Sequence, residues 1–218
     1  MESLHYIVRH PSAERSAGSP PLLVLLHGYG SNEEDLLGLA PYLDARFLIA
    51  SARAPQVLDF GGFAWFPIDF KPDGLVLRFD QAGAAREKIR DLVETLRTEH
   101  PVERVFLLGF SQGASMAIST ALAHPGLCDG VAFLSGVCAP ELVPDGVRPA
   151  APALPVLMTH GRQDLVLPIQ QGREARELLS RLSVDLDYKE YDMGHEINPE
   201  CLQDLSDWLA RHLDLAER

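Results

Sequence analysis

Short runs of apolar residues mark the strands that the sequence predicts. Strands buried on both faces of a parallel sheet show no polar alternation, because neither face meets water. The runs of this kind are Leu22–Leu26, Phe47–Ala50, Val105–Leu108, Val131–Leu134 and Leu154–Met158. The more polar run Leu186–Tyr191 is typical of a strand at the edge of a sheet.

Segments with helical spacing lie between these runs. Apolar residues at i, i+3, i+4 and i+7 form one face of an amphipathic helix. This spacing occurs at Ile89, Leu92, Val93 and Leu96, and again at Ala175, Leu178, Leu179 and Leu182. Asn198 followed by Pro199 predicts the cap and first residue of a C-terminal helix. Ser31 with Glu34 predicts a capping box for an earlier helix.

The alternation of strands and helices predicts a three-layer α/β sandwich around a mostly parallel central sheet. Residues 4–10 are expected to add an antiparallel edge strand. No linker divides the chain, so we expect one domain over residues 1–218. In such sheets ligands bind beyond the carboxyl ends of the strands, and we expect the site among the loops at that edge.

Composition and charge narrow the classes of partner. The chain has 19 Lys and Arg residues against 31 Asp and Glu residues, which makes a nucleic-acid partner improbable because phosphate binding needs clustered cations. Cys128, Cys138 and Cys201 lack the spacing of a disulfide framework or a zinc site, although a Cys128–Cys138 bridge stays open. With no export signal and no apolar run of membrane-spanning length, we expect a cytoplasmic protein without stable membrane insertion.

The sequence from Gly109 to Gly113, G-F-S-Q-G, stands where a strand pattern becomes a helix pattern. A serine at such a junction is held in a strained conformation with its hydroxyl lifted clear of the sheet, and flanking glycines prevent collisions. The pentapeptide alone is weak evidence, but the strand before it and the small-residue helix after it support Ser111 as a nucleophile. A helix that begins at Gln112 points its free N–H groups toward the serine, so the Gln112 N–H is a candidate oxyanion donor.

A serine hydroxyl becomes a good nucleophile only when a base takes its proton and a carboxylate orients that base. His195 lies in a loop after the last predicted strand and is the candidate base. Asp164 follows the run Leu154–Met158 and is the candidate acid, which gives the chain order Ser, Asp, His. Asp192 is the rival for the acid, and His160 is expected to fix its own turn by hydrogen bonds.

Two further segments complete the predicted site. His27, Gly28, Tyr29 and Gly30 directly follow the run Leu22–Leu26, where this architecture supplies a second oxyanion donor, and the Tyr29 N–H is the candidate. The segment 52–82 is rich in aromatic residues, and it is interpreted either as an apolar wall or partial lid over an acyl chain or as satellite core. Its candidate substrate contacts are Phe63, Trp65 and Phe66.

The segments "LLHGYGSNEEDL", "AWFPIDF", "LLGFSQGASMAI" and "HGRQDLVLP…YDMGHEI" together resemble the phospholipase/carboxylesterase family over nearly the whole chain. The resemblance implies an α/β-hydrolase fold without a large cap domain, no cofactor, and hydrolysis of small-molecule esters or thioesters. No metal site is expected either, because no ligand cluster with metal spacing accompanies His27. The resemblance also implies that nucleophile, acid and base map onto Ser111, Asp164 and His195. The oxyanion donors map onto Tyr29 and Gln112.

The chain departs from the family pattern in the aromatic segment and in the oxyanion loop. Family members often carry Asp directly after the aromatic pair, whereas here Pro67 and Ile68 separate Phe66 from Asp69. Tyr29 is larger than the Leu common in thioesterase members and is expected to narrow the acyl site. A lysophospholipase, an acyl-protein thioesterase, a carbon–carbon bond hydrolase or lyase and a non-catalytic binding protein remain alternatives. Acyl length and a homodimer also stay open.

Overall fold

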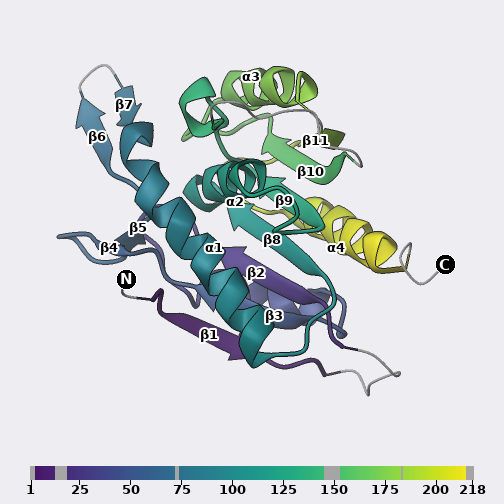
Figure 1. The fold of residues 1–218 in the computed structure, drawn as a ribbon. Coiled ribbons are helices and arrows are strands. Elements are labelled where there is room, and N and C mark those ends of the chain that lie inside the picture. The colour runs from purple at the N-terminus through teal and green to yellow at the C-terminus, as the bar shows by residue number, and fades with distance from the viewer. Residues whose placement is uncertain (1–2, 13–18, 72–73, 145–152, 183, 215–218) are drawn as a thin grey trace.

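The structure, a computed structural model, describes residues 3–12, 19–71, 74–144, 153–182 and 184–214. Its centre is a sheet in the order β1-β3-β2-β8-β9-β10-β11, as Figure 1 shows. The strands are β1 (Tyr6–Arg9), β2 (Leu22–Leu26), β3 (Leu48–Ala52), β8 (Val105–Phe110), β9 (Gly130–Leu134), β10 (Leu154–Gly161) and β11 (Val184–Tyr191). Every strand pair in this sheet is parallel except β1 with β3. The predicted mostly parallel sheet and both predicted edge strands are thereby confirmed.

Helices cover both faces of the sheet, which confirms the three-layer arrangement (Figure 1). On one face lie α1 (Ala82–Glu99), α2 (Gln112–Ala123) and α3 (Ile169–Ser180). The other face carries α4 (Pro199–Asp214) and the 3-10 helix η1 (Leu36–Tyr42). Within β2, Leu22 and Val24 pack against the first layer, whereas Leu23 and Leu25 pack against the second. A strand that is buried on both faces needs apolar residues at every position, which explains the unbroken run.

The helix starts show one correct and one wrong prediction. Asn198 caps α4 as predicted, because its Oδ1 accepts a hydrogen bond of 2.8 Å from the Cys201 N–H. The capping box of Ser31 and Glu34 does not form. The Glu34 N–H donates instead to Asn32 Oδ1 at 2.8 Å, and η1 follows as a 3-10 helix that contains Pro41. Proline lacks the N–H that an α-helix interior needs, so a full helix is disfavoured there.

The segment 52–82 leaves the sheet and forms two small hairpins. They are β4 (Gln56–Val57) with β5 (Phe63–Ala64), and β6 (Ile68–Lys71) with β7 (Gly74–Leu77), before the short 3-10 helix η2 (Phe79–Gln81). In Figure 1 both hairpins lie outside the sheet, and the β6–β7 hairpin stands beside the start of α1. Trp65 and Phe66 are buried in the main core, whereas Phe60 is 71% exposed and Phe70 is 66% exposed. The interpretation as core therefore fits Trp65 and Phe66, whereas the interpretation as an apolar wall or partial lid fits the exposed Phe60 and Phe70.

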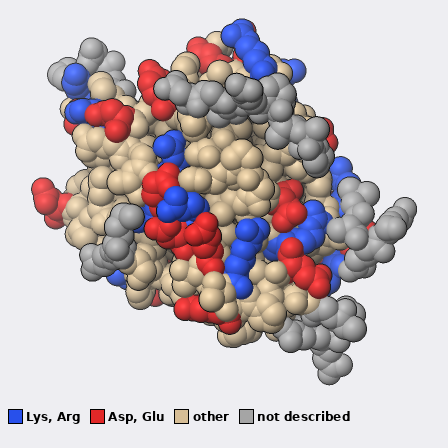
Figure 2. All heavy atoms as spheres, viewed as in Figure 1, with Lys and Arg blue, Asp and Glu red and all other residues tan. Residues whose placement is uncertain are grey.

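The structure also bears on the expectations about a cap domain, the cysteines, a membrane span and the surface charge. Another short 3-10 helix, η3 (Pro140–Leu142), lies between β9 and β10, and no described residue there builds a separate cap domain. The cysteines Cys128, Cys138 and Cys201 are free and buried, so the bridge left open does not form. Among the described residues no helix combines the length and the apolar character that crossing a membrane demands. On the face in Figure 2, basic and acidic side chains lie interspersed. Within α1, Arg90 pairs with both Glu87 and Asp91.

Candidate active site

Ser111 stands at the sharp turn between β8 and α2. Its φ of 55° and ψ of −119° place a non-glycine residue in a strained backbone region. A Cβ on Gly109 would lie 2.2 Å from the Gly113 carbonyl oxygen, and a Cβ on Gly113 would lie 1.9 Å from the Leu26 carbonyl oxygen. Only glycine fits at either position, because any side chain there would collide with the backbone. This confirms the role predicted for the two flanking glycines.

Sheet register brings the loops of the site together. Gly161 of β10 lies opposite Tyr191 of β11, so the loops that carry Asp164 and His195 leave the sheet at the same level. The Arg162 N–H donates to the Tyr191 carbonyl at 2.8 Å and ties the two loops together. Parallel strands end at one edge, which is why residues far apart in sequence meet there.

The three candidate catalytic side chains form a continuous hydrogen-bonded chain. His195 Nε2 lies 2.9 Å from Ser111 Oγ, and His195 Nδ1 lies 2.6 Å from Asp164 Oδ2. A carboxylate only accepts, so the Nδ1 hydrogen points to Asp164 and Nε2 faces the serine hydroxyl. Asp192, the rival acid, is 75% exposed at its side chain and pairs with Arg162 at 2.9 Å. The structure thus brings Asp164, and not Asp192, to the histidine.

Asp164 is held by the turn that follows it. Its Oδ1 accepts hydrogen bonds from the N–H groups of Val166 at 2.9 Å and Leu167 at 2.8 Å. His160 Nε2 donates to the Leu167 carbonyl at 2.7 Å and lies 3.6 Å from Asp164 Oδ2. His160 is fully buried and fixes its turn by hydrogen bonding, as predicted. The carboxylate is therefore fixed before any substrate binds.

The His195 ring packs at a tilt of 44° against an aromatic ring. Phe110, the residue between Gly109 and Ser111, has its ring centre 4.9 Å from that of His195. The second residue of the G-F-S-Q-G sequence thus contacts the base as well as filling the turn.

The two candidate oxyanion donors flank the serine. Gln112 is the first residue of α2, so its N–H has no acceptor within the helix. A Cβ on Gly28 would lie 3.4 Å from Ser111 Cβ, which places the loop that carries Tyr29 directly beside the nucleophile. Within the described part of the chain, the Tyr29 N–H donates to no protein acceptor. Both N–H groups are available to a developing anion, although their role stays a prediction.

His27 shapes the oxyanion loop from the inside. Its Nε2 accepts a hydrogen bond from the Ala54 N–H at 3.0 Å, and its Nδ1 donates to the Gly28 carbonyl at 2.7 Å. Burial lowers the pKa of His27 below its ordinary value, in keeping with a neutral ring that accepts at one nitrogen. The Trp65 indole N–H donates to the His27 carbonyl at 2.9 Å. His27 thus has a structural partner at each ring nitrogen.

The Gln112 side chain links the nucleophile turn to the aromatic segment. Its Oε1 accepts from the Trp65 N–H at 2.7 Å, and its Nε2 donates to the Phe66 carbonyl at 2.7 Å. Because Gln112 is buried, these bonds satisfy polar groups that water does not reach. From the sequence, only the backbone of Gln112 was predicted to act in the site. No local pattern signals the side-chain bridge, because its partners lie more than forty residues away along the chain.

A cavity of about 170 Å³ opens beside Ser111 and His195. Apart from the site residues its lining is largely apolar, which suits an acyl chain. Of the candidate substrate contacts, Phe66 lines the cavity, whereas Trp65 and Phe63 do not, because the indole is turned into the core and Phe63 packs under Arg53. The lining also includes Ile68, Phe70 and Leu77, which belong to the segment 52–82 that was interpreted as an apolar wall. Further lining residues, for which the sequence gives no signal, are Ser115, Val137, Val166 and Leu167.

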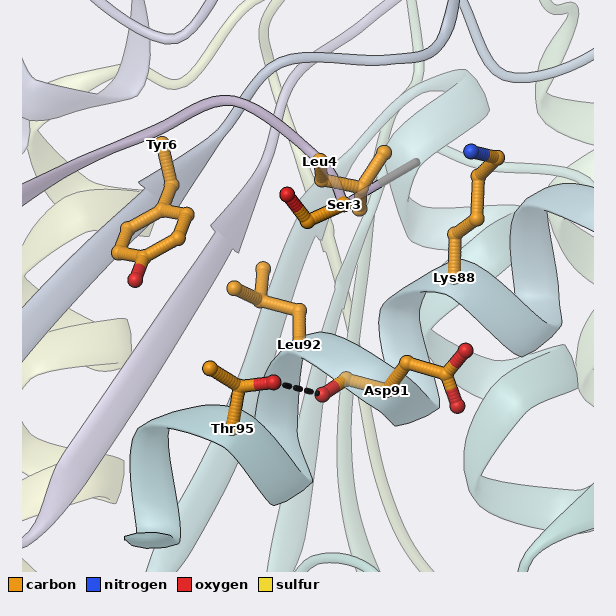
Figure 3. Close-up of a pocket in the computed structure, with 7 residues that line it drawn as sticks. All are labelled: Ser3, Leu4, Tyr6, Lys88, Asp91, Leu92 and Thr95. Atoms are coloured by element: carbon orange, nitrogen blue, oxygen red, sulfur yellow. Dashed lines mark hydrogen bonds between the residues drawn. The ribbon is translucent and has the colours of Figure 1, made fainter. Parts of the chain in front are cut away.

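A second cavity of about 150 Å³ lies far from this chemistry, between the N-terminal segment and α1 (Figure 3). The Tyr6 hydroxyl already donates to Glu99 at 3.0 Å, and the Thr95 hydroxyl donates to the Asp91 carbonyl at 2.8 Å. None of the seven residues drawn there is a histidine or cysteine that could act as a base or a stronger nucleophile. Of these two cavities, the one beside Ser111 is therefore the candidate reaction site.

A mostly parallel sheet with helices on both faces and a serine at the turn after a central strand defines the α/β-hydrolase class of proteins. Within that class, residues 12–213 match the phospholipase/carboxylesterase family, and the chain belongs to this family. With Ser111, His195 and Asp164 in hydrogen-bonded contact, it is a carboxylesterase-type serine hydrolase.

Individual relatives agree with the family assignment. An acyl-protein thioesterase 1 from Kluyveromyces lactis is 30% identical, and the alignment covers 93% of this chain and 96% of the relative. A probable inactive carboxylesterase from Oryza sativa is 29% identical over 95% of this chain and 91% of its own length. The crystal structure of esterase PE8 superposes with a TM-score of 0.85 at 28% identity, over 96% of this chain and 99% of that one.

Proposed function

We propose that the protein hydrolyses carboxylic esters of small to medium acyl chains through a Ser111–His195–Asp164 triad and an acyl-enzyme intermediate. The observation that carries this proposal is the pair of contacts that join Ser111 Oγ to His195 and His195 to Asp164. Because a probable inactive carboxylesterase is among the relatives, these contacts support the proposal more directly than family membership does.

In the first step Ser111 Oγ attacks the carbonyl carbon of the ester while His195 Nε2 takes the serine proton. The carbonyl oxygen becomes an oxyanion, which the N–H groups of Tyr29 and Gln112 stabilise. When the tetrahedral intermediate collapses, the carbon–oxygen bond to the leaving group breaks and His195 returns the proton to the departing alcohol. Asp164 stabilises the imidazolium that exists in between.

In the second step a water molecule attacks the acyl-enzyme. His195 takes one proton from that water, and the new oxyanion occupies the same pair of N–H groups. Collapse releases the carboxylic acid and restores the Ser111 hydroxyl with the proton held on His195. The cycle needs no cofactor, because every proton that leaves a nucleophile returns to a leaving group.

The apolar cavity supports the acyl side of the substrate. Phe66, Ile68 and Leu77 form part of one wall, and Val137 and Leu167 contribute to the lining from other loops. Tyr29 also lines the cavity, in keeping with the expected narrowing of the acyl site. A thioester would react by the same steps, so thioesters and lysophospholipids are the second candidate substrates. A cytoplasmic location and a homodimer stay predictions.

The test is turnover of p-nitrophenyl esters from acetate to palmitate by wild type and Ser111→Ala. We expect an optimum at short to medium chains and a loss of several orders of magnitude in kcat for Ser111→Ala, because the nucleophile is removed. A long-chain optimum favours the lysophospholipase or thioesterase alternative. Equal turnover by both proteins would overturn the triad.

Labelling by a fluorophosphonate serves as an independent check on the same serine. Wild type should react at Ser111, and Ser111→Ala should not. If folded wild-type protein stays unlabelled and inert toward every ester, the non-catalytic binding protein becomes the better explanation.

A further inference from the structure

Glu33 is a buried carboxylate that the proposed mechanism does not use. It is 4% exposed and lies just beyond the oxyanion loop, residues 27–31. The Arg53 guanidinium binds it with two hydrogen bonds, one of them from Nε to Oε2 at 2.6 Å and the other from Nη2 to Oε1. Burying a charge costs free energy unless an opposite charge pairs with it, so the Arg53 guanidinium compensates the burial of the Glu33 carboxylate.

Arg53 reaches two other parts of the structure. Its guanidinium carbon lies 4.6 Å from the centre of the Phe63 ring, the geometry of a cation–π contact. Its N–H donates to the His5 carbonyl at 2.8 Å, which fixes the residue just beyond the end of β3. Arg53 thereby joins a strand end, the segment after the oxyanion loop and the ring of Phe63.

Phe63 in turn holds the backbone of the oxyanion loop. Its carbonyl accepts from the Gly30 N–H at 2.9 Å, and its N–H donates to the Ser31 carbonyl at 2.9 Å. A Cβ on Gly62 would lie 2.0 Å from the Gly30 carbonyl oxygen, so the two backbones touch and only glycine fits. The peptide groups on the C-terminal side of Tyr29 are therefore held by Phe63.

We propose that Glu33, Arg53 and Phe63 form an oxyanion clamp in which Arg53 is the positioning residue for the Tyr29 N–H. The inference rests on the proposed function, in which that N–H stabilises the oxyanion. Arg53 acts through Phe63 on Gly30 and Ser31, and through Glu33 just beyond them. Both contacts hold the loop on the C-terminal side of Tyr29. Phe63, expected from its sequence position to contact substrate, thus acts on the reaction indirectly.

The physical reason is the distance dependence of oxyanion stabilisation. A donor must lie about 2.7–3.1 Å from the oxyanion to stabilise it, and a shift of about 1 Å can cost about a hundredfold in rate. The loop has no regular secondary structure that would hold the Tyr29 N–H in place. Its alignment depends on contacts from the segment 52–66, of which the clamp supplies the charged part.

The experiment compares Arg53→Lys with wild type on a p-nitrophenyl ester and on its thiono analogue, in which sulfur replaces the carbonyl oxygen. Lysine keeps the charge but loses the two-pronged geometry and the planar stacking. Sulfur accepts hydrogen bonds weakly, so hydrolysis of the thiono ester depends less on the oxyanion donors. The ratio of kcat on the oxygen ester to kcat on the thiono ester therefore reports on donor alignment.

Arg173→Lys is the matched control. Arg173 also binds a glutamate with two hydrogen bonds, to Glu190 Oε1 at 2.9 Å and Oε2 at 3.0 Å, and it lies in α3 away from the oxyanion loop. Both variants keep the positive charge and lose the same two-pronged geometry toward a glutamate. A change in the ratio that appears only in Arg53→Lys cannot come from a general loss of stability.

We expect Arg53→Lys to lower kcat on the oxygen ester by about tenfold to a hundredfold with little change in KM, and to lower the ratio. Phe63→Leu should shift the ratio in the same direction, and it carries the test if Arg53→Lys does not fold. An equal fall on both substrates, or an equal change in Arg173→Lys, would overturn the clamp. Failure of the proposed function is distinguishable, because wild type itself would then show no Ser111-dependent turnover.

Discussion

The two sides of Ser111 are built in different ways. On the acid side, Asp164 is held by N–H groups two and three residues further along the chain, and the loop starts beside that of His195 by strand register. On the oxyanion side, the loop of Tyr29 is held by residues more than twenty positions away. Trp65, for example, donates its indole N–H to the His27 carbonyl.

The difference shows what orients the acid and what aligns the oxyanion donor. A carboxylate in a tight turn is oriented by local geometry, which the chain keeps wherever the turn forms. The oxyanion loop has only a short turn of its own, in which the Ser31 N–H donates to the Gly28 carbonyl at 3.3 Å. Its donor is aligned only when the segment 52–66 is in place, so a defect there should weaken the reaction without removing the triad.

The largest expected effect tests the acid side. Asp164→Asn should lower kcat by about 10⁴, because the amide stabilises the wrong tautomer of His195 and no longer balances its positive charge. Asp192→Asn is the control and should keep wild-type kcat, since Asp192 is exposed and pairs with Arg162. Steady-state kinetics on a p-nitrophenyl ester measure both variants. The reverse ranking of the two would assign the acid to Asp192.

A smaller effect is expected from Gln112→Ala on the oxyanion side. The backbone N–H stays, but the side-chain bridge to the Trp65 N–H and the Phe66 carbonyl is lost. Two buried backbone groups are then unpaired, which should cost about 1–3 kcal/mol in the free energy of unfolding. We expect kcat/KM to fall by about tenfold, through a shift of less than 1 Å in the loops. Urea unfolding and ester kinetics check the two parts separately, and unchanged values in both would refute the bridge.

A third prediction concerns acid pH and the clamp. Hydrogen bonding to Arg53 lowers the pKa of Glu33 from its ordinary value of 4.5 to about 2. Because the folded-state pKa is the lower one, the stabilisation is present above about pH 4.5 and is lost as the pH falls toward 2. Allowing for the solvent that reaches Arg53, it amounts to about 1–2 kcal/mol.

Urea unfolding of wild type and Glu33→Gln at several pH values tests this directly. The stability difference between the two proteins should be largest near neutral pH and should shrink as the pH falls below 4.5. A difference that stays constant down to pH 3 would show that the charge of Glu33 contributes nothing.

The smallest expected effect concerns a residue outside the site. It serves as a control that separates a loss of global stability from a change in loop alignment. Asn198→Ala removes the cap of α4, which should cost about 1 kcal/mol in the free energy of unfolding. Ester turnover should stay at the wild-type level, since Asn198 does not line the cavity and its side chain bonds to the start of α4. A marked loss of kcat in this variant would mean that global stability, rather than loop alignment, governs the activity of the other variants.

Much of the fold follows from short-range patterns. The unbroken apolar runs predicted strands buried on both faces, and the period of the charged segments predicted α1 and α3. These features are visible along the chain because they follow from side-chain direction, which repeats every two residues in a strand and every 3.6 in a helix. The failed capping box shows the limit of such patterns, since the Glu34 N–H donates to the neighbouring Asn32 side chain and not to Ser31.

The sequence by itself determined the elements and the residue types that the chemistry needs: a glycine-flanked serine, an acid and a base, each after a strand. Tertiary structure decided which acidic residue meets His195, which aromatic residue lines the cavity, and what holds the Tyr29 N–H. Phe66 lines the cavity, whereas its neighbour Trp65 is turned into the core. Arg53 binds Glu33, which lies twenty residues earlier in the chain. Such choices depend on contacts between residues far apart in sequence, which are set only when the sheet brings the strand ends to one edge.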